Sequence, residues 1–171
     1  MERTFLDDKL ASANHTKYNA FLMVVFMFKD TRKLGTYSTT PHLGVLCHFY
    51  YDAKLKAQLP YWDKFPLCIP ADSAKGGFLG WNLHYVTQRV RKIILDELFK
   101  YMEYEPQKRL QASYGFMKKL SIYDDIKPCI KHYLLDHVRS RFLEINPVNY
   151  YKVIKMPTAQ WQKSTPYKGA K

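Results

Sequence analysis

The chain has 171 residues, the length of one ordinary domain, and its 47% hydrophobic and 16% aromatic residues supply enough apolar surface for a core. Its formal net charge of +12 gives the folded surface a positive field that attracts nucleic acid, anionic lipid or an acidic protein face. Cys47, Cys68 and Cys129 are widely spaced, which excludes a disulfide framework or a zinc site and predicts buried thiols in a reducing compartment.

The first 44 residues are predicted to form an N-terminal extension that becomes partly ordered on assembly. Residues 20–28 form an apolar run of nine residues, about half the length that a membrane-crossing helix needs, so we expect no membrane span. Acidic Asp7 and Asp8 stand where a signal peptide would be basic. Residues 29–44 mix charge with turn-forming residues, which predicts a loop or linker.

A single α+β domain is predicted over residues 45–156, and its first half is expected to be a sheet. Gly77 and Gly80 stand among large side chains, which indicates a strongly bent strand. The sequence therefore predicts a small curled antiparallel sheet or an SH3-like barrel. Segments rich in aromatic and β-branched residues, separated by turn-forming residues, are the predicted strands: 45–51, 64–70 and 77–85.

After residue 85 the apolar side chains recur every three or four residues, which is typical of helices. Proline residues set the predicted boundaries, because proline interrupts a helix but suits its first turn. A subdomain of about three helices is therefore expected before a last strand, which could close the barrel. The predicted segments are helices at 86–105, from 107 to about 120 and from 129 to about 142, and a strand at 148–156, followed by a basic C-terminal tail at 157–171.

No catalytic, cofactor-binding or metal-binding motif is found, so we predict neither an enzyme nor a cofactor. His132 and His137 are five residues apart, whereas two metal ligands on one helix face need a step of four. The glycines of residues 76–80 lack the Lys-Ser/Thr pair of a phosphate-binding loop. Asp124 and Asp125 are interpreted as a cap for the helix that follows.

Basic residues gather in residues 107–142, where eight Lys and Arg face three Asp, a local excess of five. Such a cluster can contact phosphates or an acidic partner, although it can also be a solvated face. No known nucleic-acid-binding module is visible, so any contact with DNA is predicted to be nonspecific. The residues predicted to make this contact are Lys118, Lys119, Lys127 and Lys131.

A protein interface is predicted from two other groups of side chains. Tyr61 and Trp62 lie in a connecting loop, where rigid aromatic side chains can anchor a partner. Arg139 and Arg141 flank an apolar stripe and could form fork-shaped pairs with carboxylates of a neighbouring subunit.

Three stretches, together with residues 138–142, carry a resemblance over residues 49–156. The chain resembles a family of small virion structural proteins of tailed, mainly contractile-tailed, bacteriophages. The stretches are Tyr51-Asp52-Ala53-Lys54 with Leu59-Pro60-Tyr61-Trp62-Asp63-Lys64-Phe65-Pro66-Leu67, then Gly77-Phe78-Leu79-Gly80-Trp81-Asn82-Leu83-His84-Tyr85, then Lys127-Pro128-Cys129-Ile130-Lys131-His132-Tyr133-Leu134.

The resemblance implies a non-enzymatic assembly component, made in the host cytoplasm and present in several copies in the tail, baseplate or neck of the virion. Its partners would be other virion subunits, joined through loops and termini. The charge supports an alternative, a nonspecific DNA-binding protein that protects or organises the ends of the packaged genome. An enzyme that acts on nucleic acid, with His84 and His137 as its candidate groups, is the least favoured hypothesis.

Overall fold

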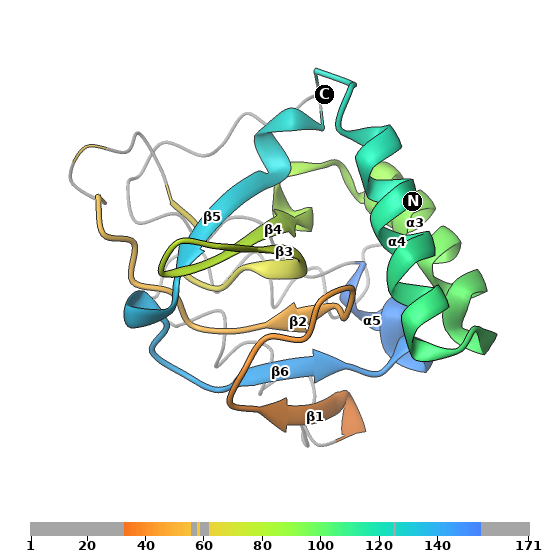
Figure 1. Ribbon diagram of the computed structural model, residues 1–171, viewed down its shortest axis with the longest axis horizontal. Coiled ribbons are helices and arrows are strands. Elements are labelled where there is room, and N and C mark those ends of the chain that lie inside the picture. Colours follow the sequence, from red (N-terminus) through yellow and green to blue (C-terminus); the bar gives the residue numbers. More distant parts are fainter. Residues whose placement is uncertain (1–32, 56–57, 59–61, 125, 155–171) are drawn as a thin grey trace, which may run out of the picture.

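A computed structural model describes residues 33–55, 58, 62–124 and 126–154. In this part of the chain, six strands form one antiparallel sheet in the order β1-β6-β2-β3-β4-β5 (Figure 1). The sheet is open, with β1 and β5 at its edges, so the predicted barrel is wrong. The strands are β1 Gly35–Ser38, β2 Cys47–His48, β3 Leu67–Ala74, β4 Gly77–Asn82, β5 Ile130–Leu134 and β6 Phe142–Ile145.

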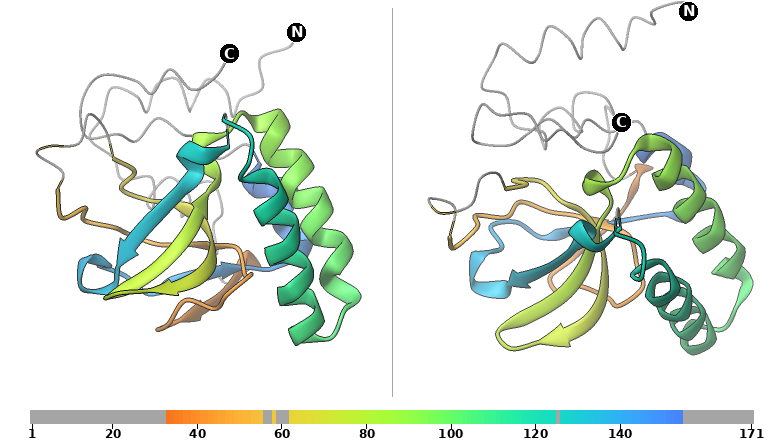
Figure 2. Two further views of the ribbon diagram at one scale, coloured as in Figure 1. Left: turned by 45° about the horizontal axis from the view of Figure 1, so that its top comes forward. Right: turned by 90° about the horizontal axis from the view of Figure 1, so that it is seen from above.

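Two helices pack beside one another at one side of the sheet (Figure 2). Helix α3, Gln88–Lys100, begins where the Thr87 hydroxyl accepts a hydrogen bond from the Val90 N–H. Helix α4, Pro106–Leu120, begins at a proline, whose fixed φ suits the first helical turn. A 3-10 helix, Tyr101–Glu103, joins them. Both predicted helices at 86–105 and from 107 to about 120 are therefore confirmed.

The third predicted helix is wrong, because residues 130–134 form the edge strand β5. The apolar residues of this segment fit helical spacing. Antiparallel pairing with β4 instead places the Tyr133 ring in an aromatic cluster. The last strand also lies earlier than predicted, at β6. Residues 147–153 form instead the 3-10 helix Pro147–Asn149 and the short helix α5, Tyr150–Val153, because Asn146 caps the Val148 N–H.

Alternation along the strands gives the sheet two apolar faces. On one face, Leu67 and Ile69 pack with Ile94 and Leu98 of α3 in the larger core. On the other, aromatic side chains pack against one another, and the Phe49 ring centroid lies 5.3 Å from that of Tyr133 and 4.9 Å from that of Phe142. The fold thus buries large side chains on both faces of the sheet.

Strand β4 depends on glycine where other atoms come too close for a side chain. A Cβ atom at Gly77 would lie 1.8 Å from the Tyr133 carbonyl oxygen, and one at Gly80 would lie 2.3 Å from the Cys68 sulfur. Gly77 therefore permits close pairing of β4 with β5, and Gly80 permits close packing against β3 in the curved β3–β4 hairpin (Figure 2).

Strand β1 lies within residues 29–44, where a loop was predicted. It pairs with β6 from Gly35–Ile145 to Ser38–Phe142, and the preceding Leu34 is buried in the larger core. This strand has only four residues and lies among turn-forming residues, so the sequence does not distinguish it from a loop.

Candidate nucleic-acid interface

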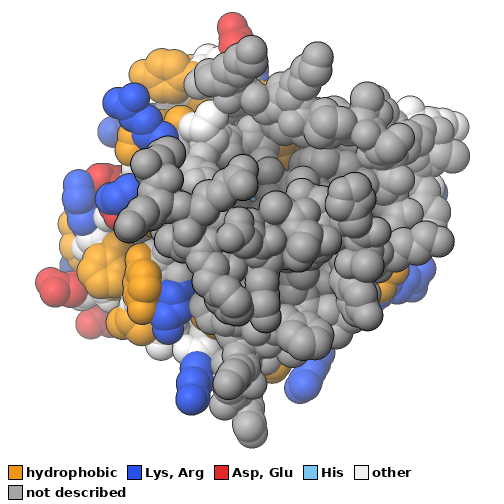
Figure 3. Space-filling model, turned by 180° about the vertical axis from the view of Figure 1, so that it is seen from behind, with side chains coloured by type: hydrophobic (Ala, Val, Ile, Leu, Met, Phe, Trp, Pro, Cys, Tyr) orange, Lys and Arg blue, Asp and Glu red, His pale blue; other side chains and the backbone are white. Residues whose placement is uncertain are grey.

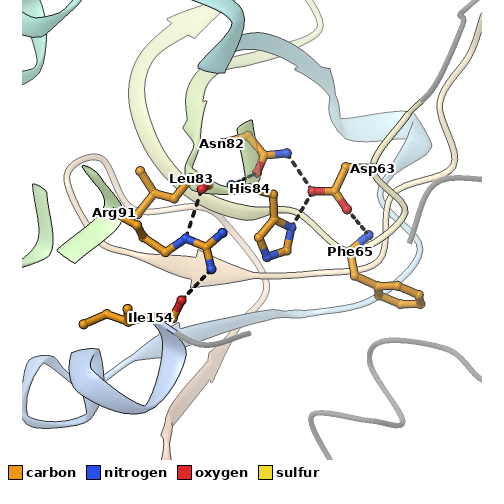
Figure 4. Close-up of polar contacts among 7 residues, drawn as sticks. All are labelled: Asp63, Phe65, Asn82, Leu83, His84, Arg91 and Ile154. Carbon is orange, nitrogen blue, oxygen red and sulfur yellow. Dashed lines mark hydrogen bonds and ion pairs between the residues drawn. The ribbon is translucent and has the colours of Figure 1, made fainter. Parts of the chain in front are cut away.

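A buried polar network surrounds Asp63, where the sheet meets the 3-10 helix Leu83–Tyr85 (Figure 4). Asp63 Oδ2 accepts hydrogen bonds from Asn82 Nδ2 at 2.8 Å and from His84 Nδ1 at 2.7 Å. Asp63 Oδ1 accepts a third from the Phe65 N–H at 3.0 Å. Burial alone would raise the pKa of Asp63, but the charge and hydrogen bond of His84, with the other two donors, hold that pKa below its ordinary value.

This network fixes the fold and does not form a reaction site. A paired Asp and His can orient a general base, as catalytic proton transfer requires. Here, however, the side chains of His84 and Asp63 are only 3% and 5% exposed, so almost none of either group is available to a substrate. The geometry therefore gives no support to His84 as a catalytic group. His137 lies elsewhere, with Nδ1 2.8 Å from the Asp52 carbonyl oxygen.

Arg91 of α3 is also part of the interior and is unavailable to an external anion. Its Nε donates to the Leu83 carbonyl at 3.1 Å and its Nη1 to the Ile154 carbonyl at 2.8 Å (Figure 4). Burial lowers the pKa of Arg91 to about 10, and the charge of Asp63 opposes part of that shift. This guanidinium joins α3 to the end of β4 and to the chain after α5.

The exposed cations of α4 have a different environment. Helix α4 contains four basic residues and no Asp or Glu, and no ion pair is found for them among the described residues. Three of them, Lys108, Lys118 and Lys119, are exposed, and Arg109 is partly so. The last two lysines also lie in the final turn, where the helix dipole favours positive charge.

Helix α3 has exposed charges of both signs, and its lysines are paired along the helix. Lys92 contacts Asp96, and Lys100 Nζ lies 2.6 Å from Glu97 Oε2. In the view from behind, Lys and Arg side chains lie beside hydrophobic and acidic ones at the margin formed by the helices (Figure 3). Of the two helices, α4 therefore offers the stronger attraction for an anion.

The four lysines predicted to contact DNA lie in different environments. Lys118 and Lys119 are exposed on α4, whereas Lys127 is exposed and its Nζ lies 2.7 Å from Asp124 Oδ1. Lys131 on β5 is half-buried, and its Nζ lies 4.1 Å from the centre of the Tyr85 ring. Burial lowers the pKa of Lys131.

The connection between β5 and β6 lies at the end of the sheet away from the helices (Figure 1), and its residues include a second group of cations. Arg139 and Arg141 are exposed in the connection between β5 and β6. The Arg141 guanidinium lies 4.9 Å from the centre of the Tyr37 ring, and Lys64 Nζ lies 5.2 Å from the centre of the Tyr50 ring. Lys64 was not among the predicted contact residues, although the aromatic residues Trp62 and Phe65 stand on either side of it in the sequence.

The two aromatic residues predicted to anchor a protein partner do not form a visible surface pair. Tyr61 lies outside the described residues. Trp62 is only 6% exposed, because it packs into the aromatic cluster on one face of the sheet. Most of its ring is therefore unavailable to a partner at the surface.

Within the described segments, no three His, Cys, Asp or Glu side chains are placed to share a metal ion. No helix there is long and apolar enough to cross a membrane. The three cysteines are buried and unpaired by disulfides, and burial raises the pKa of the Cys47 and Cys68 thiols.

Comparison with known proteins places the chain in a family. No curated protein and no solved structure matches it. A family model described as "Phage T4 terminal DNA protecting protein" matches residues 3–171, which is nearly the whole chain. The match extends the predicted resemblance to phage proteins beyond residues 49–156 and favours the DNA-binding alternative. The chain therefore belongs to the phage T4 terminal DNA protecting protein family.

Proposed function

We propose that this protein binds the ends of packaged phage DNA in the virion and covers them without catalysing a reaction. The description of its family, a terminal DNA protecting protein, supports this function. The observation that carries the proposal is the set of four basic side chains on α4, with no carboxylate in that helix and no ion pair to described residues. Phosphates would replace the counterions that these cations otherwise attract.

The arrangement of the cations favours contact with the DNA backbone. Lysine at the helix surface attracts any phosphate, whereas sequence recognition needs side chains that reach base edges in a groove. The arginines Arg139 and Arg141, far from the helices, provide a second basic region that a flexible or bent DNA end could reach. The protein is therefore expected to recognise ends by their shape, with little dependence on duplex sequence.

The test compares a linear duplex with a closed dumbbell of the same sequence, in which hairpin loops replace both ends. Fluorescence anisotropy at several salt concentrations gives the affinity for each. The proposal expects tighter binding to the linear duplex, a steep fall of affinity with salt, and slower digestion of the bound linear duplex by an exonuclease. Equal affinity for both DNAs at every salt concentration would overturn it.

A role in virion assembly is a second candidate function, supported by exposed apolar side chains. Val148, just before α5, is 63% exposed, Tyr151 in α5 is 66% exposed, and Ile122 after α4 is 71% exposed. Side chains of this kind can anchor a protein partner. Cross-linking within intact virions, followed by mass spectrometry, tests this role, which requires cross-links from these residues to other virion subunits.

The predicted domain boundaries are part of the same proposal. We expect the N-terminal extension and the tail at 157–171 to become ordered fully only with a partner, except that the stable domain of residues 45–156 also includes Leu34 and strand β1. Limited proteolysis of the isolated protein tests this boundary. Because β1 pairs with β6, cleavage is expected before Leu34. Termini as resistant as the domain would contradict the proposal.

A further inference from the structure

A pocket of about 400 Å³ lies between the edge strand β5 and residues 51–55. Aromatic side chains form much of its lining, and they are held rigidly because each is largely buried. For example, the Tyr51 and Tyr133 rings meet edge to face with centroids 4.9 Å apart. This volume is within the range of sites for small organic molecules. The aromatic residues that line the pocket are Tyr51, Trp62, Tyr85 and Tyr133.

Cations surround this aromatic lining. Lys54 and Lys131 both line the pocket, and the Lys131 ammonium lies over the Tyr85 ring. The acidic lining residue in the described part is Asp63, whose carboxylate is already bonded to His84, Asn82 and the Phe65 N–H. The pocket therefore combines aromatic surface with positive charge that no lining carboxylate is free to neutralise.

Half-burial of Lys131 adds to the attraction for an anion. Removing an ammonium from water is unfavourable, and its pKa is lowered for that reason. An anion bound beside it would restore the lost electrostatic stabilisation. The ligand that fits must therefore present a flat, partly apolar group and a negative charge close together.

We propose that this pocket takes an unpaired nucleotide at the end of a DNA strand, an inference that rests on the proposed function. The base packs against the parts of these aromatic residues that remain exposed, between 3% and 7% of each, and its phosphate lies near Lys54 and Lys131. Base-to-aromatic packing tolerates any base, because every base has a π-face. A nucleotide inside the duplex would first have to leave its stack, whereas an unpaired terminal nucleotide enters without breaking a pair.

The experiment uses the full chain and four hairpin-capped DNAs that differ only at one end. These are a closed dumbbell, a blunt end, an end with one unpaired terminal nucleotide, and the same end with an abasic residue in place of that nucleotide. The expected result is about tenfold tighter binding to the base-bearing end than to the abasic end. Lys131→Gln should reduce this difference, and Lys92→Gln, an exposed control on α3 that pairs with Asp96, should leave it unchanged.

A second measurement does not depend on any variant folding well. A 2-aminopurine placed as the unpaired terminal base changes its fluorescence when it packs against aromatic side chains. The inference expects that change on binding. Equal affinity for base-bearing and abasic ends, or no change in fluorescence, overturns the pocket inference. If the blunt end still binds better than the dumbbell in that case, the proposed function itself stands. Equal binding to all four DNAs overturns the proposed function itself.

Discussion

The interior around Asp63 and the surface of α4 are both rich in polar groups, but they use them differently. Both oxygens of the Asp63 carboxylate accept hydrogen bonds within the protein. The cations of α4 have no ion pair with the described residues. Buried polar groups need partners for the fold to be stable, whereas exposed cations do not. The contrast indicates which charges maintain the structure and which can bind a partner.

The largest expected effect comes from breaking the interior network. Asp63→Ala should lower the free energy of unfolding by about 3–5 kcal/mol, because it leaves His84 and Asn82 buried without their acceptor. Urea denaturation followed by circular dichroism measures the loss. The exposed Asp72→Ala provides the control, with an expected change below about 1 kcal/mol. Similar losses in both variants would contradict a special role for the network.

Neutralising the surface lysines should weaken DNA binding and leave the fold intact. Lys118→Gln with Lys119→Gln should lower the affinity for a linear duplex about 50-fold at 0.1 M salt and reduce the salt slope by about two. The charge-matched control, Lys92→Gln with Lys100→Gln on α3, should change the affinity less than about threefold, because carboxylates already neutralise those lysines. Equal effects of the two pairs would remove the distinction between the helices.

Acid should destabilise the interior through His48, which is completely buried next to His84 and Asp63. Burial, with the charge of His84, lowers the pKa of His48 to about 3, although Asp63 opposes this shift. Below pH 6.5 the unfolded chain therefore takes up a proton that the folded protein rejects, and stability falls by about 1.4 kcal/mol per pH unit.

The measurement is the free energy of unfolding of the wild type and of His48→Phe at several pH values. Phenylalanine keeps a ring stacked near Phe65 and cannot take up a proton. The wild type should lose about 2 kcal/mol more than the variant between pH 6.5 and 5. Asp63, with its lowered pKa, adds a loss only at more acidic pH, as the pH falls through the ordinary pKa of an aspartate. Parallel curves would show that His48 is not responsible.

The smallest expected effect is at Gly115, in the middle of α4. No heavy atom lies within 4 Å of a Cβ atom added there. Gly115→Ala should therefore raise the free energy of unfolding by about 0.5–1 kcal/mol, because alanine loses less conformational freedom in a helix. Thermal denaturation measures this gain, and the affinity for DNA should not change. A lower melting temperature would show that the side of α4 at this position is not open.

The sequence predicts the elements that have strong local signals. The spacing in residues 86–105 identifies α3, and Pro106 marks the start of α4. The sequence does not predict secondary structure correctly where pairing between distant segments determines it. Residues 130–134 fit a helical stripe but join β4, and residues 35–38 become a strand only because β6 lies beside them. Neither partner can be identified from local periodicity.

For the candidate site, too, the sequence predicts some of the exposed cations but not the contacts that the others make in the fold. The concentration of basic residues after residue 107 identifies Lys118 and Lys119 on the surface of α4. Local charge counts cannot show that Lys127 pairs with Asp124 or that Lys131 lies over Tyr85. The Asp63–His84 contact joins residues 21 positions apart in the chain, so only the folded sheet reveals it.

The hydrogen bond from Arg91 to the Ile154 carbonyl sets a limit on how far the protein can be shortened from its C-terminus. A truncated form that ends before Ile154 would lose a carbonyl that helps to hold a guanidinium inside the protein. A shortened form for crystallisation or for fusion to a reporter should therefore keep the chain through this residue. A C-terminal fusion partner would then leave the domain beside α3 and α5, on the side of the sheet opposite Arg139 and Arg141.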